Sequence, residues 1–311
     1  MSSRWATDRS CTASTFVPGV AAVLAFAAVC AMAQPGPVAV PDDGNYFRLQ
    51  IADGVELPVT TGDFLEAAET VFHDMGTRLG VPKEQFFAAV GLTQFEQQTS
   101  AEFRALLGGG KRIGLRLRPR ESNDCPARGT AGALPGNPLI SMYLGENATL
   151  TELLGILGHE LGHLFQWYAI SPGNGAGGLF DQGFASWAAG HYWTDRLEVP
   201  SLQAAVGNYI RSGTYVPLGE TEAQPQLFFP GSGAASPEAC LALRDVVYTE
   251  WAGFVEYLAA EFGRDRVYEL VRAPPVAGAE AGPPGLDYVG TFGKSLTELE
   301  AAWLAGFAES E

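Results

Sequence analysis

A run of leucines spaced three and four residues apart, between residues 150 and 164, places the strongest constraint on how this chain folds. Side chains at this spacing lie along one face of an α-helix and are buried together. Thr149 fits the N-cap of such a helix and Glu152 its third position, as in a capping box. The sequence therefore predicts an amphipathic helix that begins after Thr149. Its apolar face consists of Leu150, Leu153, Leu154, Leu157, Leu161 and Leu164.

The same helix carries the pentapeptide His159-Glu160-Leu161-Gly162-His163. Two histidines four residues apart point the same way from a helix, so both imidazoles can bind one metal ion. Glu160 lies about 100° around the helix from His159, off the metal but near enough to act on a water bound to it. The pattern predicts a metal site with a general base, and the alternative is two histidines in ordinary hydrogen bonds. His73 and His191 have no such partners and are expected to be surface or core residues.

A second stretch follows at a defined spacing. Residues 180–187 read Phe-Asp-Gln-Gly-Phe-Ala-Ser-Trp, and residues 164–181 separate His163 from Gln182. With the pentapeptide, this stretch resembles the peptidase MA-like domains of bacteria, which are gluzincin zinc metallopeptidases related to the aminopeptidase-N group. In that family the third zinc ligand is a Glu in a Glu-Gly-x-Ala stretch at this spacing. The chain departs from the family there, because the aligned residue is Gln182.

Two later segments extend the resemblance. Residues 248–263 are similar to a later helix of the family, and residues 293–303 are similar to its C-terminal helix. The resemblance covers roughly residues 60–311 and is strongest over 149–187 and 245–305. Taken without the family, most of residues 247–262 is accounted for as the buried stripe of an amphipathic helix.

The resemblance implies an α+β, zincin-like fold, in which an N-terminal mixed sheet packs on the HExxH helix and a mainly helical C-terminal half follows. It implies that His159 and His163 bind zinc, that Glu160 activates the metal-bound water, and that Tyr248 steadies the oxyanion. The implied activity is hydrolysis of a peptide or protein substrate. The Gly-x-Met-Glu-Asn motif, which holds a free amino terminus in the aminopeptidases, is absent from the sequence, so an endopeptidase is expected.

The glutamine at position 182 leaves three alternatives open. Gln182 binds zinc through its carbonyl oxygen, which is a neutral and weaker donor than a carboxylate. Alternatively, Asp181 replaces it, although one residue along a helix turns a side chain by about 100°. In the third case hydrolysis is lost, and a gluzincin-like pseudoenzyme remains as an exported binding module. The intact Glu160 favours an enzyme, because only catalysis requires a carboxylate there.

Residues 1–33 are expected to form a secretory signal peptide. Arg4 and Arg9 supply a positive start, an apolar run follows, and Ala31-Met32-Ala33 is a small-x-small cleavage site. The alternative is a membrane anchor, but the unbroken apolar stretch is about 14 residues, short of the roughly 20 that span a bilayer. Cleavage after Ala33 predicts a secreted or periplasmic protein with no stable membrane insertion.

Two cysteines, Cys125 and Cys240, remain after this cleavage, because Cys11 and Cys30 leave with the leader. Disulfides form in oxidising compartments, which an exported chain reaches. We therefore expect a bond between Cys125 and Cys240. The alternative is two unrelated thiols, since sequence alone does not give the distance between them.

Composition and charge limit the partners and the number of domains. The chain has 311 residues, of which 47% are hydrophobic, enough for one large domain or two modest ones with a sizeable core. Its formal net charge of −16 would repel nucleic acid and anionic membrane surfaces. Residues 34–45 are expected to be a proline-rich linker. Residues 46–311 are expected to form the metallopeptidase-like domain, with a sheet part over about 46–148 and a helical part over about 149–311.

Hydrophobic patterning predicts the elements of the sheet part. Alternation predicts a strand over 46–51, and Asp53-Gly54 predicts a hairpin turn into a second strand over 55–59. The apolar face of residues 63–79 predicts a helix that Gly80 and Pro82 end. Further strands are expected over 86–92, 113–117 and 139–144.

Overall fold

The structure is a computed structural model of the whole chain. It describes residues 42–43, 46–91, 112–121, 123, 125–134, 137–172, 178–223, 236–274 and 285–308. These residues belong to the unit Val38–Glu311, the second of two units into which the chain divides. The predicted signal peptide, residues 1–33, and most of the predicted linker lie outside the described residues. Within the described part, no helix is both long enough and apolar enough to cross a membrane.

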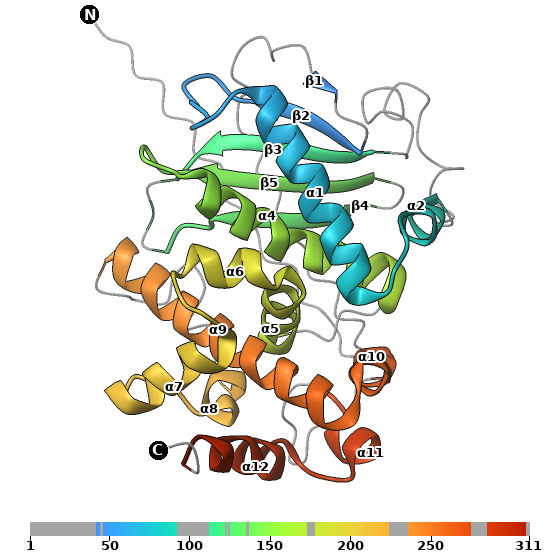
Figure 1. Cartoon of the computed structure of the whole chain (residues 1–311), viewed down its shortest axis with the longest axis vertical. Coiled ribbons are helices and arrows are strands. Elements are labelled where there is room, and N and C mark those ends of the chain that lie inside the picture. The colour runs from blue at the N-terminus through green and yellow to red at the C-terminus, as the bar shows by residue number, and fades with distance from the viewer. Residues whose placement is uncertain are drawn as a thin grey trace, which may run out of the picture. The chain divides into compact units, whose positions relative to one another are not determined.

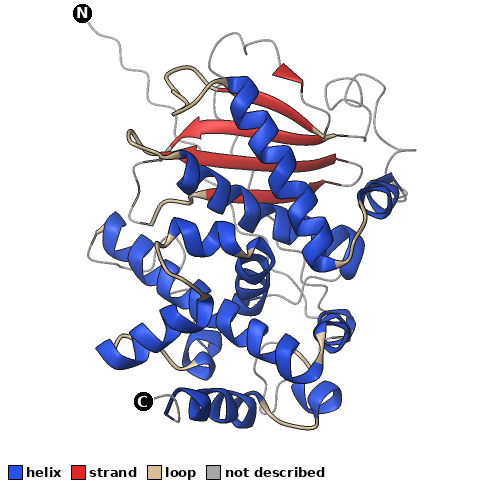
Figure 2. Ribbon diagram, in the orientation of Figure 1, coloured by secondary structure: helices blue, strands red, loops and turns tan. Residues whose placement is uncertain are grey.

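A five-stranded mixed sheet forms the N-terminal part, with the strand order β1-β2-β3-β5-β4 (Figures 1 and 2). Strands β2, β3 and β5 run parallel, whereas β1 and β4 pair antiparallel at the two edges. Buried and partly exposed residues alternate along β2 and the first part of β3, as expected for strands with one buried face. The strands predicted over 46–51, 113–117 and 139–144 are confirmed. The bounds are β1 Asp42–Asp43, β2 Phe47–Ile51, β3 Ile113–Pro119, β4 Gly129–Leu134 and β5 Asn137–Leu144.

The hairpin predicted after β2 is wrong. The turn at Asp53-Gly54 forms, with Gly54 at φ 78°, but residues 55–59 contain no strand. Both edges of β2 are already paired, with β1 on one side and β3 on the other. The chain therefore leaves the sheet after the turn. Asp42 and Asp43, from the predicted linker, supply the β1 edge.

Helix α1 (Thr61–Leu79) confirms the helix predicted over 63–79. The Thr60 side chain accepts a hydrogen bond from the N–H of Asp63 at its start. Gly80 ends the helix in the left-handed conformation, with φ 66°. Gly80 therefore ends this helix as predicted.

The strand predicted over 86–92 is wrong, because this segment belongs to helix α2 (Lys83–Gly91). Phe86 and Val90 are four residues apart and both fully buried. A short apolar run of this length does not distinguish a strand from a buried helix. Here Pro82 stands just before the helix and starts its first turn. Its carbonyl oxygen accepts from the N–H of Phe86.

Helix α4 (Leu150–Leu164) begins where predicted, and the N–H of Glu152 donates to Oγ1 of Thr149 at 3.1 Å. The carboxylate of Glu152 pairs instead with Arg120 at 3.2 Å, so the capping box is only half formed. A π-helical segment, η2 (Phe165–Ile170), continues the helix. Helix α4 packs against β4, β5, α1 and the next two helices, and is thus buried on several sides.

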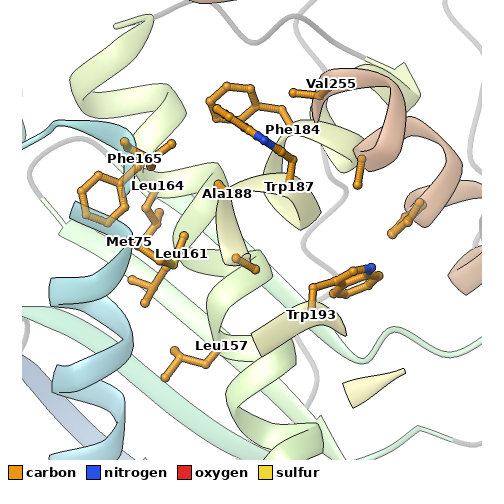
Figure 3. Close-up of a cluster of buried hydrophobic side chains, with 14 of the residues drawn as sticks. Met75, Leu157, Leu161, Leu164, Phe165, Phe184, Trp187, Ala188, Trp193 and Val255 are labelled. Atoms are coloured by element: carbon orange, nitrogen blue, oxygen red, sulfur yellow. The ribbon is translucent and has the colours of Figure 1, made fainter. Parts of the chain in front are cut away.

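The remaining described elements are helices, and this helical part follows the sheet part as expected (Figure 2). The chain is thus a mixed α and β protein. Helix α5 packs against both α4 and α9, and Figure 3 shows Leu161 and Ala188 in the apolar cluster that they share. The bounds are α5 Gly178–Ala189, α6 His191–Arg196, α7 Leu202–Ser212, α8 Leu218–Ala223, α9 Pro237–Phe262, α10 Arg264–Arg272, α11 Tyr288–Phe292 and α12 Leu296–Ala308.

Helices α4 and α5 approach closely because glycine stands where they meet. A Cβ added at Gly162 would lie 2.7 Å from the Cα and the carbonyl oxygen of Ala185. Gly183 of α5 faces α9 in the same way, with a Cβ only 2.4 Å from that of Trp251. Close-packed interiors leave no space for such atoms. Any side chain at position 162 would therefore push α5 away from α4.

We expect Gly162→Ala to lower the melting temperature by a few degrees, since overpacking of this kind costs about 1–3 kcal/mol. The matched control is Gly306→Ala on α12, where an added Cβ meets nothing within 4 Å. The control should leave stability unchanged or raise it slightly, because alanine favours helix. Thermal denaturation followed by circular dichroism compares the two. Equal melting temperatures would contradict the close approach.

A carboxyl group with an unusual environment lies on α9. Glu250 is fully buried, and its Oε1 accepts from the N–H of Val216 at 3.0 Å. Its Oε2 has no hydrogen-bond partner within the described residues. Burial raises the pKa of Glu250 to about 8, the Val216 hydrogen bond opposes this, and the Glu300 carboxylate adds to it.

A raised pKa in the folded state makes stability fall with pH, because the native chain holds a proton that the unfolded chain loses. The loss of stability begins near pH 4.5, the ordinary pKa of a glutamate carboxyl, and is complete above about pH 8. We therefore expect Glu250→Gln to be more stable than the wild type at pH 8.5, by on the order of 3 kcal/mol, and similar at pH 4.5. Urea denaturation at both pH values measures this. Exposed Glu261→Gln on the same helix is the control, and a difference from wild type that does not change with pH would refute the assignment.

Candidate functional site

The two histidines of α4 and one residue of α5 meet in a buried site. The Nε2 atoms of His159 and His163 are 3.2 Å apart, and Nε2 of His159 is 3.1 Å from Oε1 of Gln182. Gln182 also hydrogen-bonds to His163. Ligands of a tetrahedral zinc ion, with Zn–N near 2.0–2.1 Å, stand about 3.3 Å from one another. These two separations are compatible with atoms that bind one metal ion.

Aromatic and polar neighbours orient both imidazoles. Nδ1 of His159 is 2.9 Å from Oγ of Ser186, and its ring stacks on Trp193 and Tyr248 at centroid distances of 5.2 and 5.5 Å. The ring of His163 stacks on Trp167 at 5.1 Å, and its Nδ1 has no hydrogen-bond partner in the described ranges. Burial lowers the pKa of His163 to about 4. Burial, together with the neighbouring His163, also lowers the pKa of His159 well below its ordinary value. Both rings are therefore neutral at pH 7, the form in which imidazole binds metals.

The structure separates the two candidates for the third ligand. Asp181 is buried, and its Oδ1 accepts from Nε2 of Gln166 at 2.5 Å. It thus contacts η2, while the next residue, Gln182, reaches the two histidines. One step along a helix turns a side chain by about 100°, and that rotation accounts for the difference.

Glu160 lies in the same site and faces the edge strand β4. It is 5% exposed, and burial raises the pKa of its carboxyl to about 8, opposed by a hydrogen bond with the backbone of Ala131. A Cβ added at Gly129 would lie 2.4 Å from Oε1 of Glu160. A glycine at position 129 is therefore what lets the strand pass so close to the carboxyl.

A cavity of about 60 Å³ opens between these elements. His159, Glu160, Gln182 and Tyr248 all line it. Burial raises the pKa of the Tyr248 phenol, which therefore stays protonated as a hydrogen-bond donor. Four of the five predicted site residues therefore line this cavity, and the fifth, His163, lies beside it in contact with His159.

Sequence reasoning missed several other residues of the cavity. Arg128, Arg196, Arg244 and Asp245 line it too, and they come from the segment before β4, from α6 and from α9. None has a characteristic spacing to the HExxH pentapeptide, so no local signal identified them. His73 and His191 are exposed and do not line the cavity.

The predicted disulfide is confirmed. Cys125 and Cys240 are bonded, with their Cα atoms 5.4 Å apart. The bond joins the segment before β4 to the first turn of α9. Arg244 reinforces this junction, because it donates to the carbonyl oxygen of Pro126 at 3.0 Å and to Sγ of Cys125 at 2.8 Å. The edge strand and α9 are thus linked beside the cavity.

Comparison with known protein families and with curated proteins finds no match for this chain. Among the residues that the structure describes, no group of three or more His, Cys, Asp or Glu side chains is placed to hold a metal ion. Gln182, whose amide oxygen lies 3.1 Å from Nε2 of His159, belongs to none of those four residue types.

We expect Gln182→Glu to tighten zinc binding by at least about tenfold, an effect that even outer-shell changes produce. The reason is that a carboxylate oxygen is a charged and stronger donor than an amide oxygen at a position that reaches both histidines. Asp181→Asn is the control and should leave zinc affinity unchanged, since its oxygen bonds to Gln166. Competition against a chelating dye gives the affinities. An unchanged affinity for Gln182→Glu would place the third ligand elsewhere.

Proposed function

We propose that this chain is an exported, zinc-dependent peptidase of gluzincin type with a zincin-like fold, which hydrolyses peptide bonds. The observation that carries the proposal is the convergence of His159 Nε2, His163 Nε2 and Gln182 Oε1 in a buried site beside the Glu160 carboxyl. Export is proposed from the leader sequence at residues 1–33.

The donor set fits zinc. Two neutral imidazoles are common zinc ligands, and the amide oxygen supplies a third, weaker donor; the separations of Nε2 of His159 from the other two atoms suit tetrahedral binding with one position open. When bound, zinc would supply a Lewis acid that polarises a peptide carbonyl and makes a water more acidic. The hydrogen bond between Ser186 and Nδ1 of His159 would hold that imidazole in the orientation needed for binding.

In this proposal Glu160 is the general base, which takes a proton from the attacking water and returns it to the leaving amine. A nearby cation would lower the pKa of its carboxyl and favour the ionised form. Tyr248 lines the same cavity and keeps its proton, so its phenol can donate a hydrogen bond to the carbonyl oxygen as negative charge develops there.

The edge strand β4 favours an extended peptide as substrate. It is the last strand of the sheet, and its backbone at Gly129 and Ala131 passes directly beside Glu160. An extended chain can add to an exposed strand edge through main-chain hydrogen bonds. A peptide bound in this way would carry a peptide bond past Glu160. Such a mode needs no free terminus and agrees with an endopeptidase.

We expect Glu160→Gln to lower peptide hydrolysis by about 10²–10⁴-fold, the usual contribution of a general base, while the chain keeps close to one zinc ion. Glu66→Gln on α1 is the control, because this carboxylate is exposed and outside the site. Metal analysis and cleavage of a quenched fluorescent peptide library measure the two properties. Full activity of Glu160→Gln would exclude the proposed base.

The second candidate is a catalytically impaired binding module, and the neutral amide at position 182 is the observation in its favour. This candidate predicts a wild-type chain that holds no zinc and cleaves no peptide. It also predicts that replacing His159 and His163 leaves affinity for its partner unchanged. A wild-type preparation that contains zinc and loses cleavage on chelation would exclude it.

A further inference from the structure

One wall of the cavity consists of charged side chains that the proposed hydrolysis does not use. Arg128 precedes β4, Arg196 ends α6, and Arg244 and Asp245 lie on α9. Oδ1 of Asp245 pairs with Nη2 of Arg196 at 2.6 Å and also with Arg128. Three guanidinium groups from separate elements therefore share this wall with a single carboxylate.

The charge of this wall is unbalanced. Its three arginines outnumber Asp245, the carboxylate of the wall, and the donors of Arg244 include those to Pro126 and Cys125 at the disulfide junction. On its outer side the wall borders a larger hollow, where Glu152, Asp195 and Glu198 supply negative charge. Arg128, Arg196 and Asp245 line both spaces, and Glu160 lines the inner cavity, so three arginines face two carboxyl groups there. Buried charge of this kind is costly unless an opposite charge meets it, and the chain as a whole is strongly acidic.

Several N–H donors of the wall are buried and lack partners. Nε and Nη1 of Arg196 and Nε of Arg128 have no hydrogen-bond partner among the described residues. The Arg196 side chain is 5% exposed and packs over the ring of Trp193, which also stacks on His159. Unsatisfied buried donors call for an acceptor. The cavity of about 60 Å³ has room for a small group only.

We propose that Arg128, Arg196 and Arg244 form a carboxylate-binding subsite, which selects peptides that carry a carboxylate beside the bond to be cleaved. The planar guanidinium fork matches a carboxylate in geometry as well as charge. The inference rests on the proposed function, since it names the substrate class of the same site. The carboxylate comes from the C-terminus of the peptide or from an acidic side chain, and the experiment separates these sources.

Binding is measured by isothermal titration calorimetry on the full chain carrying Glu160→Gln, so that no probe is consumed. Acetyl-tetraalanine with a free C-terminal carboxylate is compared with its C-terminal amide. Amidated acetyl-Ala-Glu-Ala-Ala is compared with amidated acetyl-Ala-Gln-Ala-Ala. We expect an affinity advantage of about tenfold or more for the charged member of one pair, and that pair identifies the source.

Variants of the wall then show whether these arginines cause the difference in affinity between charged and neutral peptides. Arg196→Met and Arg128→Met should each reduce it at least severalfold, and Arg211→Met, an exposed arginine on α7, is the control for the change in net charge. Asp245→Asn should act in the opposite direction and increase the affinity for the charged peptide, because it removes the competing carboxylate. Melting temperatures show which variants are folded. Because the arginine variants should lower the affinity and Asp245→Asn should raise it, the test remains decisive if one variant fails to fold.

Equal affinities within both pairs would overturn the subsite, as would an advantage that survives both arginine variants and so arises elsewhere. Failure of the proposed function has a different signature. If charged peptides bind through the arginines but wild-type chain cleaves none, the subsite stands and hydrolysis does not. If wild-type chain cleaves neutral and charged peptides equally well, hydrolysis stands and the subsite does not.

Discussion

The close approach of α4 and α5 is the packing constraint on which the rest of the structure depends. Without a side chain at Gly162, the backbone of Ala185 comes within contact distance of α4. Gln182 and Ser186 flank Ala185 on the same helix and so reach the two nitrogens of His159. An extra carbon at the crossing would move both partners away from the imidazole. The precision of the site is therefore set by a residue that contributes no side chain to it.

Much of the fold could be predicted where local signals agree with the tertiary packing. Helix α4 and helix α1 have apolar faces together with caps, and both begin close to their predicted starts. The α2 segment was misjudged because Phe86 and Val90 fit a buried helix and a strand equally well. The hairpin failed because pairing of β2 with β3, more than sixty residues later, occupied the edge that a hairpin needs. Strand β4 was missed because Gly129–Leu134 shows no apolar alternation.

The candidate site divides in the same way. The sequence predicts His159, Glu160 and His163 as site residues because one helix carries them at the HExxH spacing. It predicts Gln182 because this residue stands at the sequence distance from His163 at which gluzincins carry their third ligand. The sequence does not predict Gly129 and Arg196, because they reach the site only when β4 and α6 pack against α4. Sequence spacing describes one helix well but does not describe a cavity wall assembled from three elements.

The disulfide makes the stability of the site depend on the redox state of its environment. Cys125 and Cys240 enclose a loop with a sequence separation of 115, and closing a loop of that size contributes about 4–5 kcal/mol in the chain-entropy account. The bond holds the start of β4 against α9, where Arg128 and Arg244 face the same cavity. In a reducing cytosol the two thiols stay apart, and this stabilisation is missing. Formation of this bond is thus a maturation step for the cavity wall, because a chain with reduced thiols lacks the covalent link between the start of β4 and α9.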